Sequence, residues 1–164
     1  MMHLGKVFFF FSFVLIFSGC SSKEYEKQES VFIVFKTATF KHADLGFIYE
    51  NSDIVKVEIY GSGQALISLE ISRENICMNL LSCMSKAQFN KEVLSQTYPK
   101  DILEHIFRGD AVFEGIKLTK IRNGFTQIIR EAGKYDIHYK VLNKQIIFHD
   151  TINNILIKVK RMDS

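Results

Sequence analysis

The sequence predicts an α+β fold: a strongly curved antiparallel β-sheet, or half-barrel, with two short helices inserted mid-chain that cover its concave face. Three observations lead to this prediction. Apolar and polar residues alternate through most of the chain beyond residue 31, which is typical of strands with one buried face. Short turn segments separate the strands, so neighbours should pair antiparallel. A central stretch has helical spacing instead, and a long sheet with one wet face needs such a cover on the other.

Four segments show the alternation most clearly. Their apolar positions are Val55, Val57 and Ile59; Ile67, Leu69 and Ile71; Ile137, Tyr139 and Val141; and Ile155, Ile157 and Val159. Turn-forming residues separate the strands, at Ala43-Asp44, Asn51-Ser52-Asp53, Gly61-Ser62-Gly63, Arg122-Asn123-Gly124, Asn143-Lys144 and Asn153-Asn154. The pattern therefore predicts about five strands before the helices and about five after them.

Two helices are expected in the middle of the chain. The first covers 86–95, with Ser85 as its N-cap. The second begins near Pro99, has Asp101 near the positive end of its dipole and ends at Gly109. The apolar faces comprise Phe89 and Val93 in the first helix and Ile102, Leu103, Ile106 and Phe107 in the second. Both helices are thus expected to pack one face against the sheet.

The N-terminal segment has the pattern of a lipoprotein signal. Lys6 precedes an apolar run over 7–17, which has the length of a signal h-region and falls short of the ~20 residues that a spanning helix needs. The run ends in Phe17-Ser18-Gly19-Cys20, which resembles the bacterial lipobox. The expected organisation is a removed signal peptide over 1–19, a lipidated Cys20 with a polar tether over 20–30, and one folded domain over 31–164.

The expected location follows from the same segment. Lipid on Cys20 should anchor the chain to a membrane, and no other cofactor is expected. Ser21 rather than Asp follows the cysteine, which resembles the default outer-membrane address of enteric bacteria. We therefore expect an envelope protein on the outer membrane, facing the periplasm.

Charge and side-chain distribution argue against nucleic-acid binding and catalysis. The chain has 21 Lys and Arg against 18 Asp and Glu, and loss of the signal removes only Lys6 from this balance. No basic stripe of the kind that nucleic acid requires stands out. The histidines, His42, His105, His138 and His149, are dispersed and accompany no nucleophile or metal motif. The sequence therefore predicts a protein that is not an enzyme and holds no metal.

The last strands are basic, with Lys140, Lys144, Lys158, Lys160 and Arg161. These residues either form a solvated sheet face or make an electrostatic contact with an anionic membrane or an acidic partner.

Cys77 and Cys83 are the two cysteines beyond the lipidation site. In an oxidising envelope the pair is interpreted as a disulfide that closes a small loop. Two buried free thiols remain the alternative. A metal site is disfavoured because no histidine lies within a few residues.

Three stretches resemble the LolB/LolA family of lipoprotein carriers. The segment 54–70, IVKVEIYGSGQALISLE, is similar to the strand, glycine loop and strand of that family. The segment 99–109 is similar to its second helix, and 133–160 to its closing hairpins. The likeness covers roughly 33–162 and implies a half-barrel that receives lipoprotein acyl chains, from a periplasmic carrier or directly. One departure concerns the glycine loop, because Gly61-Ser62-Gly63 lacks the apolar tip that the family uses to insert lipid into the membrane.

An acyl-binding cavity on the concave face is the functional expectation, and core packing of the same residues is the alternative. The candidate lining residues are Val57, Ile59, Leu69, Ile71, Ile106, Phe107, Ile137, Tyr139, Ile157 and Val159. The second functional hypothesis is a structural or assembly lipoprotein that binds a protein partner of an envelope apparatus. It predicts an exposed apolar patch or a bare sheet edge in place of the cavity.

Overall fold

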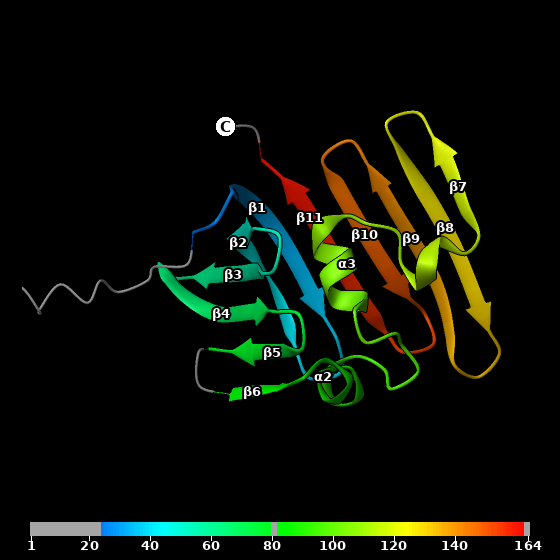
Figure 1. The fold of residues 1–164 in the computed structure, drawn as a ribbon, viewed down its shortest axis with the longest axis horizontal. Coiled ribbons are helices and arrows are strands. Elements are labelled where there is room, and N and C mark those ends of the chain that lie inside the picture. Colours follow the sequence, from blue (N-terminus) through cyan, green and yellow to red (C-terminus); the bar gives the residue numbers. More distant parts are fainter. Residues whose placement is uncertain (1–23, 80–81, 163–164) are drawn as a thin grey trace, which may run out of the picture.

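The computed structural model describes residues 24–162 except 80–81. In this part of the chain, eleven strands form one antiparallel sheet, and two α-helices follow the sixth strand (Figure 1). The strands are β1 (Lys27–Lys36), β2 (Lys41–Glu50), β3 (Val55–Gly61), β4 (Gln64–Ile71), β5 (Asn75–Met78), β6 (Ser82–Ser85), β7 (Leu118–Ile121), β8 (Gly124–Glu131), β9 (Tyr135–Leu142), β10 (Gln145–Asp150) and β11 (Ile155–Arg161). The helices are α2 (Lys86–Val93), α3 (Ile102–Arg108) and the short 3-10 helix η2 (Phe113–Gly115).

The sheet is a series of hairpins joined at its centre by the first and last strands. The strand order is β6-β5-β4-β3-β2-β1-β11-β10-β9-β8-β7. Strands β1 and β11 pair antiparallel, with Ile33 opposite Val159 and Phe35 opposite Ile157. This pairing connects the half of the sheet that precedes the helices with the half that follows them. Strands β6 and β7 are the two edges, so the sheet is open.

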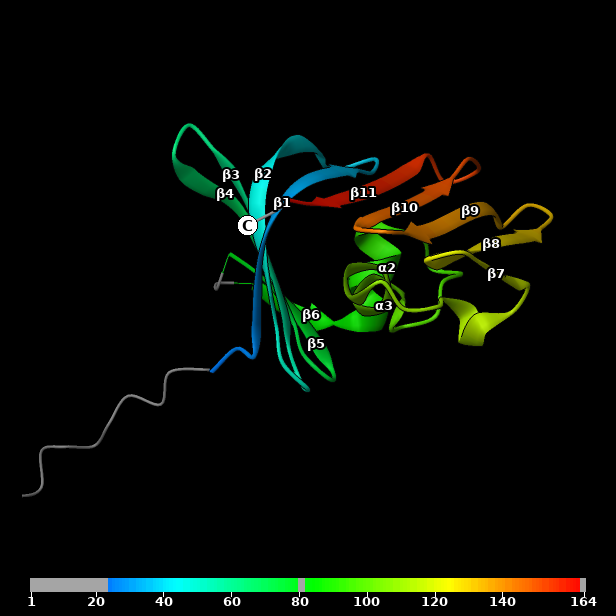
Figure 2. The ribbon, with the colours of Figure 1, turned by 90° about the horizontal axis from the view of Figure 1, so that it is seen from above.

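Figure 2 shows that strands of the two halves run in different directions and that α2 and α3 lie together on one side of the sheet. We call this side the inner face. The side chains of Ile33, Val57 and Ile157 belong to it and are fully buried. The opposite side is the outer face, where Phe32 and Lys158 are exposed. The core of the molecule therefore lies between the inner face and the helices.

The predicted alternation explains this burial. In β3, Val55, Val57 and Ile59 are buried, whereas Lys56 and Glu58 between them are partly exposed. Strands β9 and β11 repeat the pattern. The prediction that one face of the sheet is apolar and the other polar is thus confirmed at the strands where the alternation is strongest.

The turn predicted at Ala43-Asp44 is wrong. Strand β2 runs through both residues, which lie opposite Val34 and Ile33 of β1. The chain turns earlier, where the Thr37 side-chain oxygen accepts from the Phe40 amide at 3.1 Å. Ala43 and Asp44 are exposed because β2 extends past β3 there and pairs only with β1.

The tether predicted over 20–30 is also too long at its C-terminal end. Strand β1 begins at Lys27, which lies opposite Glu50 of β2. The polar residues of this segment are held by strand pairing and by the ion pair of Glu29 with Arg161, so they join the sheet without burying an apolar side chain. Six strands then precede the helices, one more than the sequence predicted.

Both helices are shorter than predicted. Helix α2 ends at Val93 rather than at residue 95, because Leu94 leaves the helical conformation, and α3 begins at Ile102 rather than near Pro99, whose carbonyl accepts from the Ile102 amide in the preceding turn.

The capping signals are found as predicted, with one exception. The Ser85 side chain accepts from the Gln88 amide and caps α2, as expected. Gly109 ends α3 in the left-handed conformation with φ 79°, which glycine adopts at little cost. Asp101 makes no side-chain cap on α3 and binds Lys86 instead.

Candidate functional site

The ten residues predicted to line a cavity lie close together, eight on the inner face of the sheet and two on α3. They lie on β3, β4, α3, β9 and β11, and all belong to one buried cluster. None of their side chains is more than 1% exposed. Phe107 of α3 packs its ring edge against Phe35 of β1, with centroids 6.4 Å apart. In this conformation the ten residues are therefore packed core, and α3 occupies the position where a ligand would contact them.

The open grooves that the structure describes lie elsewhere. One of about 520 Å³ is lined by outer-face residues of β8, β9 and β10, including Ile128, Lys140 and Ile147. A second of about 340 Å³ continues across β10, β11 and β1 and includes Phe32 and Lys158. Both grooves are lined mainly by apolar surface, and each also has at least one lysine in its lining. Periodicity had indicated a polar outer face, and these grooves are the feature that it missed.

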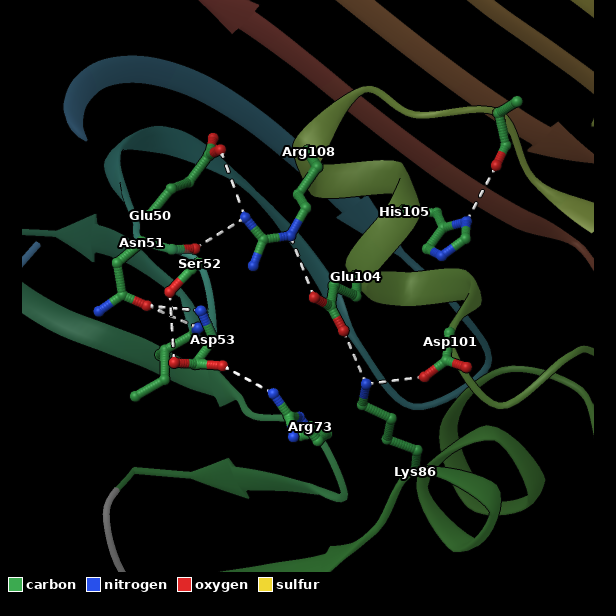
Figure 3. Close-up of polar contacts among 12 residues, drawn as sticks. Glu50, Asn51, Ser52, Asp53, Arg73, Lys86, Asp101, Glu104, His105 and Arg108 are labelled. Carbon is green, nitrogen blue, oxygen red and sulfur yellow. Dashed lines mark hydrogen bonds and ion pairs between the residues drawn. The ribbon is translucent and has the colours of Figure 1, made fainter. Parts of the chain in front are cut away.

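A network of charged residues holds the helices at the edge of the inner face, and we call it the helix clasp: Glu50, Lys86, Asp101, Glu104 and Arg108 (Figure 3). The Lys86 amine donates to Asp101 at 2.8 Å and to Glu104 at 2.7 Å. Its side chain is only 3% exposed. Burial disfavours the charged amine, but the bonds to the two carboxylates outweigh this and hold the pKa of Lys86 above its ordinary value. The start of α2 is thereby tied to α3.

Arg108 ties α3 to the sheet. Its Nε donates to Glu104 at 3.0 Å, and its Nη1 donates to the backbone carbonyl of Asn51, between β2 and β3, at 3.0 Å. Nη1 also lies 3.9 Å from the Glu50 carboxylate. The Arg108 Nη2 and one Glu50 oxygen are buried without a hydrogen bond. The helix is thus attached at this edge by a few polar contacts, of which some are incomplete.

Two further buried polar side chains attach the segments around the helices. The Gln127 amide of β8 accepts from the Val112 amide at 2.9 Å and donates to the Val112 and Ile116 carbonyls. The Asp150 carboxylate of β10 accepts from the Tyr98 hydroxyl, which lies in the link between α2 and α3. Burial, followed by the hydrogen bond to Asp150, raises the pKa of Tyr98 far above its ordinary range. The one sequence signal for this hydrogen bond was an aspartate at the end of an alternating strand, just before Asn153-Asn154.

The loop Gly61-Ser62-Gly63 forms the tight turn between β3 and β4, with Ser62 at φ 52° and Gly63 at φ 80°. In Figure 2 this hairpin extends away from the helices. Leu66, the nearest apolar residue, lies in β4 and is 51% exposed. A side chain added at Gly61 would meet the Leu66 side chain at 2.4 Å, so Leu66 rests against the loop.

Cys77 and Cys83 form a disulfide between β5 and β6, where the two residues lie directly opposite each other. Their Cα atoms are 3.9 Å apart. The bridge therefore fastens the edge strand β6, which leads directly into α2.

Three of the histidines have described neighbours. His138 and His149 were interpreted as dispersed, but the register of β9 and β10 places them opposite each other on the outer face. The His105 ring shares a hydrogen bond with the Ala111 carbonyl at 2.9 Å. Within residues 24–79 and 82–162, no cluster of His, Cys, Asp and Glu is suited to a metal ion.

The predicted signal peptide over 1–19 and the predicted lipidation site Cys20 lie outside the described residues. No helix of the described residues is long and apolar enough to cross a membrane. No protein-family model matches this sequence, and no curated protein is significantly similar to it.

Proposed function

We propose that the chain is a lipid-anchored envelope protein that binds an acyl chain of a lipid or lipoprotein between the inner face of a half-barrel and α3. The observation that carries the proposal is the cover of the sheet: an extensive apolar inner face is shielded by two helices of eight and seven residues. Short helices have little stability of their own. This cover is the part of the core that a ligand could replace with least disturbance of the sheet.

The energetics favour a ligand with more than one acyl chain. Helix α3 buries Ile102, Leu103, Ile106 and Phe107. At about 1.5–3 kcal/mol for each such side chain, lifting the helix costs about 6–12 kcal/mol. An acyl chain of about 16 carbons gains about 12 kcal/mol at ~0.8 kcal/mol per buried CH₂. One chain therefore roughly offsets the helix, and a second makes binding favourable, as with a diacylated or triacylated lipoprotein.

The resemblance to LolB/LolA carriers is consistent with this function. Those carriers have a half-barrel and hold lipoprotein acyl chains, and the order of strands and helices here is compatible with their architecture. The missing apolar tip at Gly61-Ser62-Gly63 argues that this chain receives or holds lipid and lacks their insertion step.

Photo-crosslinking tests the proposal in the native membrane. Phe107 is replaced by benzoylphenylalanine in the full-length chain, and the exposed Ile152, 50% accessible, is the matched control position. Irradiation in cells should give adducts carrying acyl chains at position 107 and none at 152. Arg108→Gln should increase the yield at 107 because it loosens the helix clasp, whereas Arg122→Gln in an exposed turn should not. Absence of acyl adducts at 107 in both backgrounds would contradict the proposal.

A structural or assembly lipoprotein is the second candidate. The observation that favours it is the set of exposed apolar side chains on the outer face, which includes Phe32 at 40%, Leu45 at 52% and Ile128 at 46%. Benzoylphenylalanine at Ile128 would then give one protein adduct of defined mass, without acyl adducts at Phe107.

A further inference from the structure

The outer face across β2, β1, β11, β10, β9 and β8 combines lysines with apolar side chains and has no acidic residue in three consecutive cross-strand rows. The first row runs through Leu45, Phe32, Lys160, Gln145, Leu142 and Gly124. The second runs through Ala43, Val34, Lys158, Ile147, Lys140 and Thr126, and the third through Lys41, Lys36, Leu156, His149, His138 and Ile128. We call these three rows the basic apolar face.

The five lysines of this face are Lys36, Lys41, Lys140, Lys158 and Lys160, and none forms an ion pair with another described residue. Asp136, two residues before His138 on β9, lies 2.8 Å from Arg130 and 3.4 Å from the His138 ring. By contrast, Arg161 of the same basic strand points to the inner side and is paired with Glu29 and Glu50. The outer face therefore carries five lysines whose charge no described acidic side chain offsets.

The shape of the face fits lipid headgroups. The two outer grooves meet at Ile147, which lies between Lys158 and Lys140 in the second row. Each groove thus has an apolar floor with amines beside it. An anionic phospholipid presents the complementary arrangement, with a phosphate above a glycerol and acyl region. Lysines near an anionic surface each add about 1 kcal/mol of attraction, and an exposed Phe can be buried at the boundary between headgroups and acyl chains.

The chain outside the structure limits how far this face can be from a bilayer. Glu24, the first described residue, lies four residue steps after Cys20, so their Cα atoms are at most about 14 Å apart. Glu24 is itself fixed, because its carbonyl accepts from the Asn51 side chain at 2.8 Å. Phe32 lies five residues along β1 from Lys27, or about 17 Å. A lipid on Cys20 therefore keeps the basic apolar face within reach of the membrane surface.

We propose that the basic apolar face docks on a membrane surface containing anionic phospholipid, so that the sheet lies against the bilayer and the helices face away from it. The limit on the distance between this face and the bilayer depends on the proposed lipid anchor at Cys20. The charge and register of the face do not depend on the proposed acyl-binding function. Docking of this kind gives the anchored domain a fixed orientation and points the helix clasp away from the bilayer.

Fluorescence quenching in vesicles tests the docking. The full-length lipidated chain carries a fluorescent amino acid at Phe32, or at the exposed Ala87 of α2 as a control position. It is reconstituted into phosphatidylcholine vesicles with or without about one third phosphatidylglycerol, with a nitroxide lipid as quencher. We expect quenching at position 32 only with phosphatidylglycerol, its loss in 0.5 M salt, and little quenching at position 87 throughout.

Charge removal makes the test quantitative. The triple variant Lys140→Gln, Lys158→Gln, Lys160→Gln should lower the ratio of docked to undocked molecules about 100-fold, from about five-fold per lysine. Lys91→Gln, Lys100→Gln, Lys120→Gln removes the same charge from exposed sites outside the face and should leave quenching unchanged. Circular dichroism checks that both triple variants remain folded.

Three results would overturn the docking proposal: no quenching at position 32 with phosphatidylglycerol, equal quenching without it, or equal losses in both triple variants. A protein adduct obtained in cells through Ile128, with position 32 unquenched in vesicles, would assign the face to an acidic protein instead. Acyl adducts at Phe107 are scored separately. A chain that docks without such adducts would disprove acyl binding alone, and one that forms them without docking would disprove only the membrane orientation.

Discussion

At the scale of single residues, Asp150 joins three parts of the described chain through one buried carboxylate. One oxygen accepts from the Asp136 amide at 3.1 Å and from the Ile152 amide at 3.0 Å. The other accepts from the Tyr98 hydroxyl and from the Asn153 side chain. Strand β9, the turn before β11 and the link between the helices therefore share this group. A fifth donor, the Asn153 amide at 3.3 Å, leaves both oxygens of this buried carboxylate well supplied with hydrogen bonds.

Tyr98→Phe should lower the free energy of unfolding by about 1.5–3 kcal/mol, because it removes a hydrogen bond to a buried carboxylate without changing the ring packing. Tyr135→Phe is the matched control. The Tyr135 hydroxyl also donates to a carboxylate, Glu131, at 2.8 Å, but that carboxylate is exposed, so the loss should be below 1 kcal/mol. Urea unfolding of the two variants measures the difference. Equal losses would show that Asp150 is solvated and does not anchor the helix link.

Glu29 gives the stability of the β1 and β11 pair a pH dependence. Burial would raise the pKa of Glu29, but bonds from Lys27 and Arg161 outweigh it and hold the pKa below its ordinary value of 4.5. A carboxyl with a lower pKa in the folded than in the unfolded chain stabilises the fold above the unfolded value, and this stability is lost as pH falls through the folded value. The free energy of unfolding, measured from pH 6 to pH 3, should therefore fall less steeply with pH in Glu29→Gln than in the parent chain. Glu114→Gln, at an exposed position, should leave the slope unchanged.

At the scale of elements, the two helices behave as one unit because Lys86 begins α2 and binds both Asp101 and Glu104 of the α3 region. Lys86→Met should lower the free energy of unfolding by about 2 kcal/mol, less than the 3–5 kcal/mol typical of a fully buried pair, because Asp101 is 37% exposed. Lys91→Met in the same helix is exposed and should change it by less than 0.5 kcal/mol. A neutral Lys86→Met would show that the helices are held by apolar packing alone.

The elements also show which parts of the fold the sequence could predict. Strand β3 and helix α3 follow from local patterns, because alternation and a terminal Gly109 act within a few residues of each other. The ten inner-face residues were found for the same reason. Strand β2 was interrupted by a false turn, since Ala43 and Asp44 sit where the strand has a neighbour on one side only and needs no alternation. The helix clasp could not be predicted, because Lys86 and its partners lie 15 and 18 residues apart and meet only once α2 and α3 have packed.

At the scale of the whole molecule, the first and last strands of the described chain pair with each other at the centre of the sheet. Strands β1 and β11 occupy the centre of the strand order, with Val31 opposite Arg161. Such a pairing closes a loop that contains every other described element. Its formation therefore has a high entropic cost, and the stabilising contacts between the two strands form only after this loop has closed. The two halves of the sheet are consequently expected to unfold together once this pair separates.

Amide hydrogen exchange should therefore be slowest at the centre of the sheet and faster toward its edges. Amides of β1 and β11 that bond to each other should exchange only through global unfolding, whereas those of the edge strands β6 and β7 should exchange through local opening at much lower free energy. Mass spectrometry of the full-length chain, with exchange times from seconds to days, measures this order. Strand β7 is the sharper case, since β6 is fastened by the Cys77 and Cys83 disulfide and β7 has only β8 as a neighbour. Protection of β7 equal to that of β11 would contradict the open sheet and would indicate that a strand from another chain continues it. Protection that instead falls in β1 and β11 together, with the edges unaffected, would place the weakest joint of the molecule at its centre.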